Sequence, residues 1–324
     1  MSTLGEPAEP GPGPRPVPRP VPVPVRHTPA SLASAAVRQL RPKQWAKNVF
    51  MLPALVFSLE FLDPRSVLHF AVGFFSFSML ASAGYVLNDW LDREADRRHP
   101  KKRFRPIASG ALPGWAAGAL LAACLASGVG AALWLSPMFL LVALTYLSTT
   151  LSYSFYFKHR VILDVMFLSS GFVWRALAGA IAIEVHVSAW LFLCAAFLSL
   201  FLGFNKRRGE LLQLGAQGGT RRNLAEYGPK MLEQFQAILT SNVVLSYALY
   251  TVLGPTPWMT ATIPWVLYGI FRYIYLVEQK GEGGAPDETL FRDRPLLVTC
   301  LGYGVTAVAV LLADHADLLP PLVP

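Results

Sequence analysis

Three side chains whose oxygens could bind a metal ion follow a long apolar run of the chain. Asn88, Asp92 and Asp96 are spaced four residues apart. If the apolar run is a helix that continues past the membrane surface, these three share one face over roughly 12 Å. Asp89 is close enough around the helix to flank that face. The spacing predicts a site as large as a hydrated metal ion with a diphosphate group.

The acidic group is followed by a strongly basic stretch that ends at Gly110. Its bases are Arg93, Arg97, Arg98, Lys101, Lys102, Arg103 and Arg105. Carboxylates that hold Mg²⁺ beside bases that hold phosphate oxygens are typical of a site for a phosphorylated, Mg²⁺-bound substrate. The alternative is a solvated loop whose charge only orients the chain in a membrane, but orientation requires no acids in register.

A second polar group lies further along the chain. Lys158 and Asp164 fall near the membrane surface, and Arg175 follows Asp164 by eleven residues. Eleven residues make about three turns, which places Arg175 about 16 Å deeper on the same face. Because an arginine facing lipid is costly, Arg175 must face the interior. Two interpretations stay open: an ion pair with an acid on another helix, or a polar cavity entered from the cytoplasm.

Two shorter stretches could also contact a phosphorylated substrate. Lys43 and Lys47 flank Trp45 at the start of the first apolar segment, which is typical of a membrane anchor or of a pair that binds a phosphate. The stretch NKRRGE covers residues 205–210, and no aspartate occurs between residues 205 and 233.

The elements that must position these residues are membrane helices. With 53% hydrophobic and 15% charged residues, the chain is not an ordinary soluble domain, and its cysteines have no zinc or disulfide spacing. We expect an all-α integral membrane protein of nine transmembrane helices, at residues 45–62, 66–87, 115–134, 137–157, 163–183, 188–204, 234–254, 258–277 and 296–313.

The distribution of charge predicts the orientation. The N-terminal region and every second loop are basic, whereas the opposite loops hold only Arg65. The positive-inside rule therefore places the N-terminus and all candidate site residues on the cytoplasmic side of the cell (inner) membrane. Residues 1–37 are proline-rich and are expected to form a disordered cytoplasmic tail before a catalytic domain at 38–324.

The motif from Asn88 to Asp96 resembles the first aspartate-rich motif of the UbiA superfamily of intramembrane prenyltransferases. Four further stretches are similar to the branch of that family that transfers phosphoribose to a polyprenyl phosphate: RPKQWAKN, HPKKRFRPIASG, YSFYFKHRVILD and NKRRGE. Members that act on aromatic acceptors usually carry a second DxxxD motif in the loop between the sixth and seventh helices. This chain lacks that motif between its predicted segments 188–204 and 234–254.

The resemblance implies a UbiA-like bundle with a cytoplasm-facing polar cavity, Mg²⁺ as the cofactor, and transfer of 5-phosphoribose from phosphoribosyl diphosphate to a polyprenyl phosphate lipid for cell-wall arabinan synthesis. It implies a metal site and phosphate-binding residues. The metal ligands are Asn88, Asp89, Asp92 and Asp96. Asp164 would bind a second Mg²⁺ or the ribose hydroxyls. The phosphate-binding residues are Lys43, Lys47, Lys101, Arg103, Arg105, Tyr153, Lys158 and Arg175.

Two other functions stay open: a prenyl diphosphate:acceptor transferase on the same fold, and a transporter or lipid flippase. No nucleic-acid partner is expected, and the sequence leaves open whether the protein forms a homo-oligomer.

Overall fold

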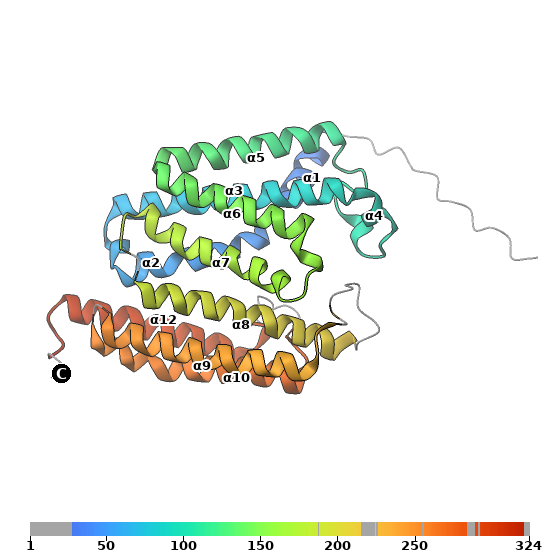
Figure 1. Ribbon diagram of the computed structural model, residues 1–324. Helices are drawn as coiled ribbons and strands as arrows, with labels where there is room; N and C mark the ends of the chain where they lie inside the picture. The colour runs from blue at the N-terminus through green and yellow to red at the C-terminus, as the bar shows by residue number, and fades with distance from the viewer. Residues whose placement is uncertain are drawn as a thin grey trace, which may run out of the picture.

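The computed structural model describes residues 28–320 except 187, 215–223, 225, 255, 284–288 and 291, and within these the chain is helical. The long helices run antiparallel to their neighbours, with α1 to α7 in one group and α8 to α12 in another (Figure 1). The α-helices are α1 Pro29–Leu40, α2 Leu52–Phe57, α3 Pro64–Leu91, α4 Arg93–Arg98, α5 Gly114–Leu135, α6 Pro137–Phe155, α7 Leu163–Ala182, α8 Ala189–Leu214, α9 Pro229–Leu253, α10 Ile263–Lys280 and α12 Arg294–His315. The short 3₁₀ helices are η1 Pro42–Met51, η2 Glu60–Leu62, η3 Lys102–Phe104, η4 Phe157–His159 and η6 Pro257–Thr262.

Seven of the described helices are long and apolar enough to cross a membrane: α3, α5, α6, α7, α8, α9 and α12. Each coincides with a predicted segment, so the protein is a multi-pass membrane protein. The predicted segment 258–277 forms α10, an 18-residue helix that carries Arg272 and ends at Lys280. The predicted segment 45–62 is divided among η1, α2 and η2, with Pro53 in the first turn of α2. The count of nine spans therefore stays a prediction.

Local sequence signals start the long helices. Asp63, Ser136 and Asp293 each precede a helix, and their side-chain oxygens accept backbone N–H groups of its first turn. A proline stands within the first two positions of each of these helices, where no N–H is needed for the helical ladder. These caps leave fewer N–H groups without a partner at the helix ends.

The predicted boundary at residue 37 falls inside α1, which begins at Pro29. Thr28 and Ser31 form a reciprocal capping pair at the start of this helix. Ala35 is fully buried in a cluster with Val86 of α3. Apolar packing thus orders the segment from Thr28 onward, while residues 1–27, the rest of the predicted tail, lie outside the described residues.

A glycine lets η1 pack closely on α7. A Cβ atom on Gly179 would lie 2.3 Å from the carbonyl oxygen of Met51, which no side chain could tolerate. Close approach of these two backbones brings Asn48 of η1 to Arg175 of α7.

Candidate active site at the charged end of the bundle

The acidic motif lies where α3 leaves the bundle, at the end that also carries α4 and the connection from α6 to α7 (Figure 1). The expectation that Asn88, Asp92 and Asp96 share one face required a helix that continues through Asp96, and the helix is interrupted. Helix α3 ends at Leu91, Asp92 has φ −85° and ψ 2°, and α4 begins at Arg93. Aspartate is a poor helix former, and here it stands at the start of a charged run that favours water over the bundle.

The motif divides into two pairs of side chains. Asp89 and Asp96 are both 2% exposed, and both accept hydrogen bonds from Nη1 of Arg105, at 2.9 and 2.7 Å. Asp89 also accepts from Arg41 at 2.6 Å and from Gln39 at 2.9 Å. Arg105 thus joins Asp89 of α3 to Asp96 of α4 across the break at Asp92.

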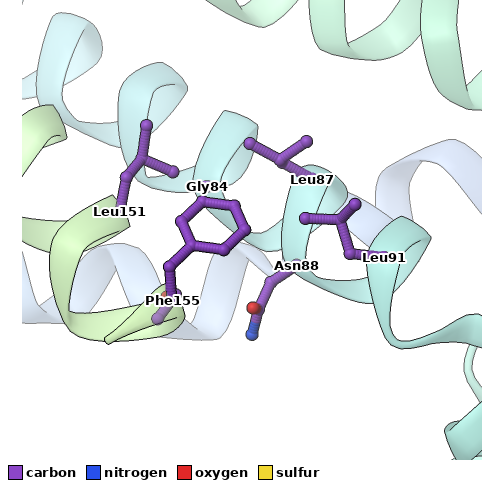
Figure 2. A pocket seen from close by; sticks show the side chains of 7 residues that line it. Gly84, Leu87, Asn88, Leu91, Leu151 and Phe155 are labelled. Atoms are coloured by element: carbon purple, nitrogen blue, oxygen red, sulfur yellow. The ribbon is translucent and has the colours of Figure 1, made fainter. Parts of the chain in front are cut away.

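Asn88 and Asp92 form the other pair. Asn88 lines a narrow pocket between α3 and α6 that is too tight to admit a water molecule, together with Gly84, Leu87, Leu91, Leu151, Ser154 and Phe155. Figure 2 shows its amide group near Phe155 of α6 and Leu91 of α3. Asp92 is half-buried, and no described group donates a hydrogen bond to its carboxylate. The pocket is mostly apolar, so an open polar cavity at this end is not confirmed.

The predicted phosphate-binding bases differ in exposure. Lys101 and Arg103 are exposed, and the Arg103 guanidinium lies 4.8 Å from the ring centre of Phe104. Lys158 and Tyr153 are half-buried near the end of α6. Of these predicted residues, Arg105 contacts the acidic motif, whereas Lys158 lies in the connection between α6 and α7.

The stretch around Trp45 packs into the bundle. The Trp45 indole N–H donates to Ser82 of α3 at 3.1 Å, so this tryptophan is not a simple membrane anchor. Lys43 is exposed and Lys47 is half-buried on either side of it. The pair therefore lies beside α3, the helix that carries Asn88 and Asp89.

Arg175 lies in a buried cluster of neutral groups. It donates to Asn48 at 2.7 Å, to the Gly171 carbonyl at 2.7 Å and to the Tyr146 hydroxyl at 2.8 Å. Its guanidinium also lies 4.7 Å from the Tyr146 ring centre. Among the described residues no acid pairs with Arg175, so the first of our two interpretations fails for this part of the chain.

Asp164 is fully buried, and described partners occupy both carboxylate oxygens. Arg207 of α8 donates to Oδ2 at 2.8 Å, and the Tyr227 hydroxyl donates to Oδ1 at 2.5 Å. Arg207 also donates to Glu210 at 2.9 Å. Our sequence analysis missed Arg207, Tyr227 and Arg41 as members of these clusters, although Arg207 stands in NKRRGE and Arg41 begins RPKQWAKN.

The described residues contain no group of three histidine, cysteine, aspartate or glutamate side chains that could hold a metal ion. Mg²⁺ often keeps several waters and binds through one or two carboxylates together with the phosphates of a substrate. The carboxylate of Asp92 and the amide oxygen of Asn88 fit that smaller requirement. Asp89 and Asp96 accept hydrogen bonds from Arg105, and Asp89 also accepts from Arg41 and Gln39. They could bind the metal ion only if these donors moved away.

Comparisons with known proteins agree with this architecture. Residues 49–292 match the model of the UbiA prenyltransferase family. The chain is 37% identical over 291 residues to a decaprenyl-phosphate phosphoribosyltransferase of Corynebacterium glutamicum, covering 86% of this chain and 87% of the relative. It is 34% identical over 296 residues to the protein of the same name in Mycobacterium tuberculosis, covering 88% and 97%.

The fold is also that of a solved structure. A UbiA homolog from Archaeoglobus fulgidus bound to DMAPP and Mg²⁺ superposes with a TM-score of 0.67 at 19% identity, covering 86% of this chain and 99% of that one. Since the family model spans most of the sequence and the helices adopt the same arrangement, the chain belongs to the UbiA prenyltransferase family.

Proposed function

We propose that this protein transfers 5-phosphoribose from 5-phosphoribosyl 1-diphosphate to a polyprenyl phosphate and releases diphosphate. The observation that carries the proposal is the sequence identity to the two phosphoribosyltransferases, which extends over nearly the whole chain. The absence of aspartate between residues 205 and 233 supports it, because acceptor-prenylating members usually have a second DxxxD there.

The reaction breaks the bond between the ribose anomeric carbon and diphosphate, and it forms a bond from that carbon to a phosphate oxygen of the lipid. The attacking group is already an oxyanion, so the site needs no general base. His99 is not placed as a general base, because its Nδ1 already accepts hydrogen bonds from the backbone N–H groups of Lys101 and Lys102, at 3.2 and 3.3 Å. The imidazole therefore shapes the basic turn.

Asn88 and Asp92 are the residues that best fit a metal ion at this site. Mg²⁺, when bound, supplies positive charge that neutralises the departing diphosphate. The proposed role of Asp92 is to hold the metal ion with its carboxylate, to which no described side chain donates a hydrogen bond. Asp96 and Asp89 stay predicted ligands, and their present role is to hold Arg105 and Arg41.

The bases have two phosphorylated substrates to bind. Lys101, Arg103, Arg105 and Lys158, with Tyr153, are proposed to bind the donor, because the first three follow the acidic motif in the chain and the α6–α7 connection lies at the same end of the bundle. Arg175, Lys43 and Lys47 are proposed to bind the lipid phosphate, since Arg175 is buried within the bundle and has no acidic partner among the described residues. The proposed location is the cell membrane with the site on the cytoplasmic side, and the product would serve the synthesis of cell-wall arabinan.

Mass spectrometry of lipids tests the proposal. The full chain in nanodiscs is given phosphoribosyl diphosphate, decaprenyl phosphate and Mg²⁺, and we expect a phosphoribosylated lipid that is absent when EDTA is added. A parallel sample receives a prenyl diphosphate and an aromatic acid, because the archaeal neighbour was solved with DMAPP. Prenylation of the acceptor without any phosphoribosylated lipid would overturn our assignment. Entry of labelled donor into sealed vesicles without either product would instead indicate a transporter.

A further inference from the structure

The connection between α6 and α7 contains a strained turn. Ile162 has φ 68° and ψ −53°, and the Leu163 N–H donates to the Val161 carbonyl at 2.8 Å. This is a γ-turn with positive φ at its central residue, a rare form that is costly for a β-branched side chain. Such a backbone persists only where its surroundings hold it in place.

Tyr227, which precedes α9, holds this turn. The Ile162 N–H donates to the Tyr227 hydroxyl at 2.7 Å, and the same hydroxyl donates to Asp164. Burial, with Asp164 second, raises the pKa of the Tyr227 hydroxyl well above its usual value, so it stays protonated and donates at neutral pH. One hydroxyl therefore satisfies both the N–H of the strained residue and a buried carboxylate.

Arg207 anchors the other side of the carboxylate. Its guanidinium is 1% exposed and donates to both Asp164 and Glu210. Removing the Asp164 carboxylate would take from the buried Arg207 one of its two acidic partners, which is unfavourable. Protein donors thus occupy both carboxylate oxygens of Asp164, and neither oxygen is directed to a substrate.

The strained turn follows directly on η4, which carries Lys158. The Phe157 ring stacks on Phe167 of α7 with 3.8 Å between ring centres, and the Asp164 N–H donates to the Arg160 carbonyl at 2.9 Å. The path of η4 is therefore coupled to the first turns of α7.

We propose that Tyr227 and Asp164 are positioning residues that latch the α6–α7 connection so that Lys158 meets a phosphate of the donor. The role of Lys158 rests on the proposed function, whereas the latch itself does not. Asp164 then orients the connection and is not a ligand of a second metal ion or of the ribose.

The substitution Tyr227→Phe tests the latch, because it removes the hydroxyl and keeps the ring. We expect trypsin to cleave after Lys158 or Arg160 at least about tenfold faster in the variant, and the KM for phosphoribosyl diphosphate to rise about tenfold with the KM for decaprenyl phosphate within about twofold. Tyr247→Phe is the matched control: Tyr247 is 4% exposed and hydrogen-bonds Thr262 at 2.5 Å. It should change neither readout.

A second variant separates latching from general loss of stability. Glycine adopts positive φ readily, so Ile162→Gly combined with Tyr227→Phe should recover most of the trypsin resistance and of the KM, and should fold where the single variant does not. Wild-type cleavage and KM in Tyr227→Phe would overturn the proposal, as would failure of the glycine to restore either. If the wild-type protein makes no phosphoribosylated lipid, the proposed function fails, yet the trypsin comparison still decides whether the latch exists.

Discussion

Asp89 and Asp96 are bridged by a single nitrogen, Nη1 of Arg105, at 2.9 and 2.7 Å. The bridge joins the last turn of α3 to the short α4 and to the basic stretch that follows. Neither Asn88 nor Asp92 takes part in this bridge. The four predicted metal ligands therefore differ in what they contact, and this difference can be measured.

Asp89→Ala should destabilise the protein. The substitution leaves Arg41 and Gln39 without their buried acceptor and Arg105 with Asp96 alone, which we expect to cost about 3 kcal/mol. The apparent unfolding temperature in detergent should fall clearly. Glu94→Gln is the matched control, because Glu94 is exposed and pairs only with neighbouring arginines. Equal unfolding temperatures for the two variants would contradict a structural role of Asp89.

Asp92→Asn should abolish activity without unfolding the protein. Its carboxylate is half-buried and has no described hydrogen-bond donor, so the folded state loses little. Transfer of phosphoribose should fall at least about 100-fold, because the charge proposed to hold the metal ion is gone. The measurement compares product formation with unfolding temperature in the same preparation. Full activity in this variant would remove Asp92 from the site.

Arg175→Gln should weaken binding of the lipid substrate. Arg175 is a buried cation whose described partners are neutral, so a lipid phosphate is the anion we expect it to meet. The KM for polyprenyl phosphate should rise at least about tenfold, while the KM for phosphoribosyl diphosphate stays within about twofold. Tyr146→Phe keeps the guanidinium and should have a smaller effect. A rise only in the KM of the donor would show that the two phosphate roles are exchanged.

The unfolding temperature should depend on pH through Asp293. Arg272 hydrogen-bonds this carboxylate and lowers its pKa, so the folded state binds its proton less readily than the unfolded chain, where the value is about 3.9. Its stabilising contribution is complete above that value and is lost as the pH falls through the lower folded value. Asp293→Asn keeps an N-cap but loses the charge.

We therefore expect the gap in unfolding temperature between wild type and Asp293→Asn to be constant above about pH 5 and to narrow below about pH 4. Asp63→Asn is the comparison, since Asp63 caps α3 and makes no ion pair among the described residues. At neutral pH, the difference in unfolding temperature between wild type and Asp63→Asn should be smaller than that between wild type and Asp293→Asn. A gap for Asp293→Asn that widens in acid would contradict the assigned pair.

Much of the architecture could be predicted from the sequence, because membrane helices are recognised by the apolar composition of a local stretch of chain. Long apolar runs predicted the seven spanning helices. Motifs such as the one from Asn88 to Asp96 pointed to the family before any contact was known.

Only the tertiary structure decided which side chains meet. Asp89 pairs with Arg41, which is 48 residues away, and Asp164 pairs with Arg207 and Tyr227, which are 43 and 63 residues away. Helical periodicity tells which residues share a face, but not what that face packs against. That depends on how separate helices associate, and it gives two predicted ligands, Asp89 and Asp164, partners among arginine and tyrosine side chains.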